Sequence, residues 1–298
     1  MEGCKLFIVG AGPAGMAAAA AARQAGCTDI VLADRAVHSG GILPQCVHEG
    51  FGLSAFGTEL TGPAYAGLLE TLLEGPGIRL LLNTEVLRIS KDRTALLSSR
   101  DGLTELGFER MILAAGCRER SIGALPVAGT RPAGVYTAGQ AQEMINLRRW
   151  NLGEKIVILG SGDLGMIMAR RFTLEGKRVL ALLEQEDRIG GMARNYHRCV
   201  EAFRIPIRFR STVTEVHGTG RVSGVTVRNL DSGEEDFLPC DALVTAVGLI
   251  PERELVRGLG APEWLALAGN CSRVHDLVDS AVAEAEYAGR KAGRALAG

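Results

Sequence analysis

Three glycines and one acidic residue near the N-terminus have the types and spacing that bind a dinucleotide phosphate. Gly10, Gly12 and Gly15 form the pattern GxGxxG after the apolar run LFIV, and Asp34 follows a second apolar run, IVL. The first glycine permits a tight turn, the second lets a pyrophosphate approach the backbone, and the third lets a helix pack closely against the strand. The first amides of that helix would face the phosphates, and the acid would hold a ribose. The alternative is a glycine turn with a structural role. The residues predicted to contact this first nucleotide are Gly10, Gly12, Pro13, Ala14, Gly15, Asp34 and Arg35.

The same arrangement occurs a second time, 150 positions later. The pattern GxGxxG returns from Gly160 to Gly165 within KIVILGSGDLG, and Glu184 stands where Asp34 stands in the first copy. A Gly-Gly pair follows the acid at the same distance in both copies. Such an internal repeat predicts two nucleotide-binding units in one chain. The residues predicted to contact the second nucleotide are Gly160, Gly162, Asp163, Leu164 and Glu184.

Alternating strands and helices must position these residues. Apolar strands are expected at 6–9, 30–32, 111–116, 155–159, 179–183, 241–248 and 265–270, with helices after each glycine turn and from His275 to the C-terminus. Short strands within 78–108 are expected to form a small β-meander, with further irregular strands at 207–215, 222–229 and 234–238. The segment 121–139, rich in proline and glycine, is expected to be a linker. The pattern indicates an α/β fold of two Rossmann-like, three-layer domains, each with a central parallel sheet.

Composition narrows the class of protein. The 298 residues are 47% hydrophobic and 22% charged, with a formal net charge of −1, so the chain has material for a core and no basic stripe for nucleic acid. No apolar run reaches about 18 residues, and the first strand begins too early for a signal peptide. Seven cysteines without a CxxC pair indicate a reduced, cytoplasmic protein and argue against a metal site.

The order of these motifs resembles the pyridine nucleotide-dependent flavoproteins, which include thioredoxin reductases, ferredoxin reductases and NADH oxidases. The matching features are two GxGxxG turns with their acids, strands ending in AAG and VG, and AGN before a last helix. The resemblance implies an FAD domain built from residues 1–117 and 241–298, with an NAD(P)H domain at 118–240 between them. The segments GGILPQCVHEGFG, AAGCRER, GTRPAGVYTAGQAQ and GNCSRVHDLVD further resemble a bacterial subfamily related to subunits of opine oxidase, hydrogen cyanide synthase and anaerobic glycerol-3-phosphate dehydrogenase.

The resemblance also implies roles for further residues. Asn270 stands where the family usually has an aspartate that binds the ribityl chain, and an amide can both donate and accept there. His275 and Asp276 would open the last helix, whose N-terminal dipole would stabilise negative charge on the flavin. Other residues implied to contact the cofactors are Gly41, Ile42, Leu43, Val86, Ala115, Gly116, Gly248 and Gly269.

Two residues carry separate predictions. The carboxylate of Glu184 would accept hydrogen bonds from both ribose hydroxyls and repel a 2′-phosphate, so NADH is expected to be preferred over NADPH. Cys46 lies where disulfide reductases of this superfamily place redox cysteines, and His48 could stabilise a thiolate. However, the second cysteine of such a pair is missing, and the alternative is a buried packing cysteine.

Three functions follow. The first is an NADH-dependent FAD oxidoreductase that passes electrons to a partner protein or a small acceptor. The second is the flavoprotein subunit of an amine or alcohol dehydrogenase complex of the opine or glycerol-3-phosphate type. The third is a nucleotide-binding sensor or scaffold with a structural flavin. A homodimer is the habit of the family.

Overall fold

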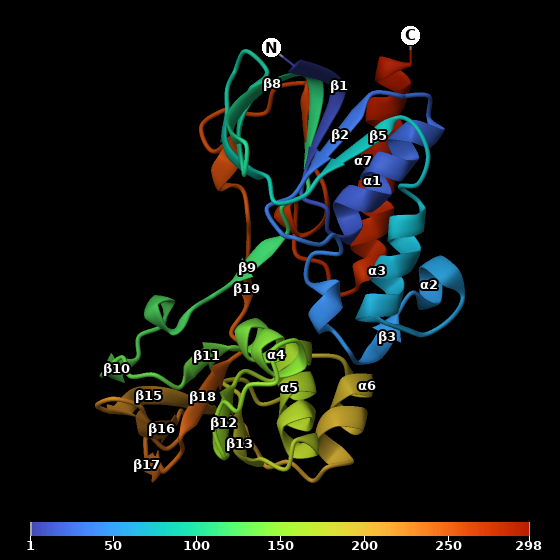
Figure 1. The fold of residues 1–298 in the computed structure, drawn as a ribbon. Coiled ribbons are helices and arrows are strands. Elements are labelled where there is room, and N and C mark those ends of the chain that lie inside the picture. The colour runs from blue at the N-terminus through green and yellow to red at the C-terminus, as the bar shows by residue number, and fades with distance from the viewer. Residues whose placement is uncertain (1, 298) are drawn as a thin grey trace. The chain divides into compact units, whose positions relative to one another are not determined.

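The computed structural model describes residues 2–297, which divide into two compact units. The first comprises residues 2–118 and 250–297, and the second comprises residues 119–249. The chain passes between them at β9 (Cys117–Glu119) and β19 (Leu249–Pro251), two short strands that pair with each other (Figure 1). The second unit is therefore an insertion in the first. The second boundary lies after 249 rather than after 240, because the strand predicted to return to the first unit pairs within the second.

A mostly parallel sheet forms the centre of the first unit. Its strands are β1 (Glu2–Val9), β2 (Ile30–Ala33), β5 (Ile78–Leu81), β6 (Glu85–Ile89), β7 (Thr94–Ser99), β8 (Gly102–Leu113) and β20 (Leu265–Leu267). The order is β5-β2-β1-β8-β7-β6, and β20 pairs with the second half of β8. The meander predicted within 78–108 is present as β6, β7 and the first half of β8, which are antiparallel.

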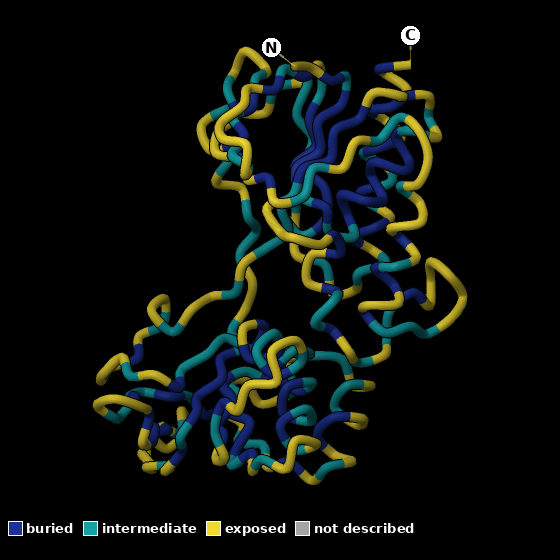
Figure 2. The backbone as a smooth tube through the Cα atoms, viewed as in Figure 1, coloured by how far each residue is buried: buried dark blue, intermediate teal, exposed yellow. Residues whose placement is uncertain are grey.

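Side chains alternate between the two faces of this sheet, as the pleat of a strand requires. Leu6 and Ile8 face a core with α1 (Pro13–Gln24), α3 (Gly62–Thr71) and α7 (Val278–Leu296), whereas Phe7 and Val9 face a core with the meander. Figure 2 shows β1, β2 and α1 as the most buried part of this unit. Helix α7 lies beside α1, and a Cβ added to Gly289 would come within 2.2 Å of the Ala18 carbonyl oxygen.

The second unit repeats this plan with a smaller sheet. Its parallel strands are β11 (Val135–Thr137), β12 (Lys155–Leu159), β13 (Arg178–Leu183), β14 (Ile207–Arg208) and β18 (Ala242–Thr245), in the order β11-β18-β12-β13-β14. Helices α4 (Ala138–Asn146), α5 (Asp163–Leu174) and the short α6 (Ala193–Asn195) accompany it. A second sheet consists of β10 (Ala128–Gly129), β15 (Ser211–Gly218), β16 (Val222–Asn229) and β17 (Glu235–Leu238).

Some predicted boundaries are wrong. Helix α7 begins at Val278, three residues after the predicted start at His275. The predicted linker at 121–139 contains β10, β11 and the start of α4. The first unit also has a loop with β3 (Glu49–Phe51), α2 (Leu53–Phe56) and β4 (Leu60–Thr61). Within residues 2–297, no helix has both the length and the apolar character needed to span a bilayer.

Candidate nucleotide-binding sites

The first glycine turn has the backbone that its sequence predicts. Gly10 has φ of +104°, a conformation that favours glycine, and a Cβ added to Gly15 would lie 1.7 Å from the Gly10 carbonyl oxygen. Helix α1 starts at Pro13 after Gly12, without a side-chain cap. Its first amides are therefore available to a phosphate, which fits the pyrophosphate of FAD.

The acid of the first unit lies next to this turn. One carboxylate oxygen of Asp34 accepts a hydrogen bond from the Ala11 amide at 2.7 Å, and the other accepts one from the Ala36 amide at 2.8 Å. These bonds fix the carboxylate at the carboxyl end of β2, where a ribose is expected in this fold. The neighbouring Arg35 is exposed.

Other residues predicted to contact FAD lie in the same unit. A Cβ added to Gly41 would come within 3.0 Å of Gly12 Cα, so the segment 40–43 passes directly over the glycine turn. Ile42 is 53% exposed there, whereas the Leu43 side chain is buried in the core. Gly116 follows β8 with φ of +72° and open space where a Cβ would be. Of the remaining two predicted residues, Val86 is buried and Ala115 is half-buried.

A short turn before α7 holds the other predicted FAD residues. The Asn270 side-chain oxygen accepts a hydrogen bond from the His275 amide at 3.0 Å. The His275 ring is buried against Glu284, and Asp276 is exposed. The prediction that His275 and Asp276 form the first turn of the helix is wrong, because both precede it. The free amides of α7 belong instead to the residues from Val278 onward.

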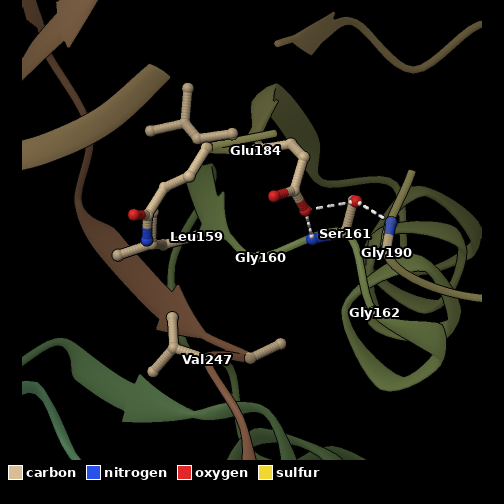
Figure 3. Close-up of a pocket in the computed structure, with 10 residues that line it drawn as sticks. Leu159, Gly160, Ser161, Gly162, Glu184, Gly190 and Val247 are labelled. Carbon is tan, nitrogen blue, oxygen red and sulfur yellow. Dashed lines mark hydrogen bonds between the residues drawn. The ribbon is translucent and has the colours of Figure 1, made fainter. Parts of the chain in front are cut away.

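The second glycine turn lines a cavity of about 230 Å³. The cavity lies at the carboxyl ends of β12, β13 and β18, between Gly160, Gly162, Glu184, Gly190 and Val247 (Figure 3). Ligands of open α/β sheets bind outside the carboxyl ends of the strands. The cavity therefore has the position expected for a second dinucleotide. Gly248 follows β18 and is exposed, with φ of +108°.

Glu184 is held by a network that sequence reasoning missed. The Ser161 hydroxyl and amide both donate to one carboxylate oxygen, the amide at 3.0 Å (Figure 3). The Glu186 amide donates to the other carboxylate oxygen at 3.0 Å. The same hydroxyl accepts a hydrogen bond from the Gly190 amide at 2.7 Å. Burial alone would raise the pKa of Glu184, but these hydrogen bonds outweigh it and lower the pKa, so the carboxylate is charged at neutral pH.

Asp163, the first residue of α5, binds the loop that follows Glu184. One of its carboxylate oxygens accepts hydrogen bonds from the Met192 amide at 2.8 Å and from the Asn195 side chain at 2.7 Å. A Cβ added to Gly191 would come within 2.6 Å of the Asp163 amide, so glycine is needed at this point. Leu164, the next residue of the helix, is half-buried. The carboxylate of Asp163 thus orders the loop that follows Glu184.

The structure argues against a redox role for Cys46. Its side chain is buried, and burial raises the pKa of the thiol to about 12. The thiol donates to the Ile42 carbonyl oxygen at 3.4 Å. Such a group is a neutral thiol at pH 7, whereas a redox cysteine works as a thiolate. The packing alternative fits Cys46 better than the redox prediction does.

The chain belongs to the pyridine nucleotide-disulphide oxidoreductases, whose family model matches residues 4–264. This match confirms the predicted family, and proteins of this family bind FAD and NAD(P)H. The chain is 28% identical to the glutamate synthase (NADPH) small chain of Escherichia coli, over 89% of this chain and 56% of the relative. It is 29% identical to the hydrogen cyanide synthase subunit HcnB of Pseudomonas aeruginosa, over 85% of this chain and 58% of the relative. The chain thus spans somewhat more than half the length of these two relatives.

Solved structures show the same fold. The thioredoxin reductase of T. acidophilum superposes with a TM-score of 0.79 at 20% identity, covering 98% of both chains. That of Lactococcus lactis gives a TM-score of 0.78 at 19% identity, covering 98% of this chain and 99% of the other. The predicted α/β fold with Rossmann-type domains is therefore confirmed.

Proposed function

We propose that this protein is an NADH-dependent FAD oxidoreductase that passes electrons to a partner protein or a small acceptor. The observation that carries the proposal is the repeated site: each unit has a glycine turn whose backbone is bonded to an acid, Asp34 in one and Glu184 in the other. FAD, when bound, supplies the chemistry that accepts a hydride from a nicotinamide and releases electrons to an acceptor.

Different residues of this chain would bind the two nucleotides. In the first unit, Asp34 would hold the adenosine ribose of FAD, and the amides of α1 would bind the pyrophosphate. In the second unit, Glu184 would accept hydrogen bonds from the two ribose hydroxyls of NADH. Its charge, with Glu186 and Asp187 nearby in the sequence, opposes the 2′-phosphate of NADPH.

The proposed electron acceptor is a separate molecule. Cys46 is a buried thiol with a raised pKa, so the proposal has no electron relay through it. Rhodocoxin reductase and the putidaredoxin reductase–putidaredoxin complex, both similar to this chain, are named for redox partners. A partner protein is therefore the acceptor that we favour. A cytoplasmic location and a homodimer stay predictions.

Anaerobic stopped-flow absorbance tests the proposal. FAD-loaded protein is mixed with NADH and, separately, with NADPH at the same concentration. We expect NADH to bleach the oxidised flavin band faster than NADPH does. A protein that binds FAD and is bleached by neither nucleotide would contradict the proposed reaction.

The second candidate, a flavoprotein component of a dehydrogenase complex, is supported by similarity to one of the opine oxidase subunits of Rhizobium meliloti. The two chains are 28% identical over 60% of this chain and 38% of the relative. In that case electrons would come from an amine or alcohol oxidised on a different polypeptide of the complex. Bleaching by such a substrate only in the presence of a co-purified polypeptide, with no bleaching by NADH, would favour this candidate.

A further inference from the structure

Glu284, on the second turn of α7, accepts three hydrogen bonds from the turn that precedes the helix. One carboxylate oxygen accepts from the Gly269 amide at 3.2 Å and from the His275 ring nitrogen Nε2 at 2.7 Å. The other accepts from the Ser272 hydroxyl at 3.0 Å. A single side chain therefore receives three donors spread along the segment Gly269–His275. Hydrogen bonds to a charged acceptor are stronger than neutral ones, so this contact organises the turn.

Hydrogen bonds through His275 link Glu284 to Asn270, the residue predicted to bind the ribityl chain. The His275 side chain is only 4% exposed, and its ring is held by Glu284. The amide of His275 donates to the Asn270 side-chain oxygen at 3.0 Å, and the Asn270 side-chain nitrogen lies 3.6 Å from Cys117 Sγ. Glu284 thus orients the His275 ring, and the His275 amide orients the side chain of Asn270.

Arg253 binds two carbonyl groups of the same turn. Its Nε donates to the Cys271 carbonyl oxygen at 2.6 Å, and its guanidinium also donates to the Ser272 carbonyl oxygen. Donors of the turn therefore meet Glu284, whereas acceptors of the turn meet Arg253. Both the donors and the acceptors of this segment are therefore bonded to charged side chains.

The turn lies beside the first glycine turn. Gly269 has φ of +68°, and a Cβ added there would come within 2.7 Å of the Ala14 side chain at the start of α1. Ala14 belongs to the helix end that is expected to bind the pyrophosphate of FAD. Asn270, one residue further, is thus placed for the part of FAD that follows the pyrophosphate.

We propose that Glu284 is a positioning residue for FAD, acting through His275 and Asn270 on the ribityl and flavin half of the cofactor. The inference rests on the proposed binding of FAD to the first unit. The proposal distinguishes the two halves of FAD within that site. Asp34 and the glycine turn would hold the adenosine half, and among residues 2–297 Glu284 makes no hydrogen bond to either of them. Loss of Glu284 should therefore weaken FAD binding and spare ADP binding.

Calorimetric titration of the full apo-chain with FAD and with ADP tests this. For E284A we expect the Kd for FAD to rise about tenfold, or 1.4 kcal/mol, with the Kd for ADP within about twofold of wild type. E284Q should recover most of the affinity, because its amide oxygen can accept the two bonds that reach one carboxylate oxygen. E286A is the matched control, since Glu286 is on the same helix and pairs with Arg290 at 3.2 Å on the surface. It should leave both Kd values unchanged.

Several results would overturn the inference. They are an unchanged ratio of the FAD and ADP Kd values in E284A, an equal loss of both affinities, or a similar effect in E286A. If E284A does not fold, S272A replaces it; this variant removes one bond to Glu284 and should raise the FAD Kd about threefold. Wild-type protein that binds FAD but is not bleached by NADH would contradict the proposed reaction and leave this inference standing. Wild-type protein that binds no FAD would overturn both.

Discussion

Replacing Ser161 with alanine removes one hydroxyl from the second nucleotide site and leaves its backbone unstrained. Ala11 occupies the equivalent position of the first unit, and its amide bonds to Asp34 as the Ser161 amide bonds to Glu184. The change is therefore confined to two hydrogen bonds. One is donated by the hydroxyl to the Glu184 carboxylate, and the other is accepted from the Gly190 amide at 2.7 Å.

The magnitude follows from the chemistry of these two bonds. A neutral hydrogen bond contributes about 0.5–1.5 kcal/mol, and one to a charged group about 1.5–3 kcal/mol. Because Glu184 is half-buried beside a cavity, water can replace part of the loss. We expect S161A to lower the free energy of unfolding by about 2 kcal/mol at pH 7.

The difference in unfolding free energy between wild type and S161A should depend on pH. The pKa of Glu184 is lowered in the folded chain, so its hydrogen bonds stabilise the fold above the unfolded pKa of about 4.3 and lose this effect as pH falls. The difference between wild type and S161A should therefore narrow as the pH is lowered from about 6 to below 4. Urea unfolding followed by circular dichroism measures it. S223A is the control, because Ser223 is exposed on β16 of the same unit. Equal stabilities of S161A and S223A at pH 7 would refute the reasoning.

Three further predictions concern both sites. E184A should lower the ratio of kcat/KM for NADH to that for NADPH by about tenfold, because a charge that opposes the 2′-phosphate is lost; an unchanged ratio would contradict this. G165A should reduce the melting temperature by several degrees, since its Cβ would lie 2.2 Å from the Gly160 carbonyl oxygen, whereas G67A, with open space on α3, should not. C46S should keep full NADH-to-acceptor activity, and the native Cys46 thiol should resist alkylation at pH 7, so rapid labelling at this cysteine would count against its buried state.

The glycine turns and their acids could be predicted because their requirements are local. A tight turn with positive φ at Gly10 and Gly160, a helix packed against a strand, and an acid after the next strand all leave marks within about 30 residues. The alternation of apolar runs and helices indicated the fold class for the same reason. The boundary after 240 could not be placed this way, because the partner strands of an apolar run such as β18 do not follow from its own residues.

The contacts that order the two sites depend on tertiary structure. Nothing in the glycine pattern distinguishes a Ser161 that bonds to Glu184 from one that faces water. Glu284 looks like any acid on an amphipathic helix, although its carboxylate bonds to the His275 ring, which lies before the start of α7. Burial of Cys46 is likewise a property of the packed unit, and the sequence alone left both its interpretations open.

The insertion of one unit within the other determines the order in which a ribosome can supply them. Helix α1 precedes the second unit in the sequence, but α7, which covers it through Gly289 and Gly293, follows that unit. The second unit is continuous in sequence, so all of its strands are available before the first unit can close. The small side chains of α1 thus lack their partner helix until α7 is made, and a truncated chain that ends near residue 250 should fold the second unit while leaving the first open to proteolysis.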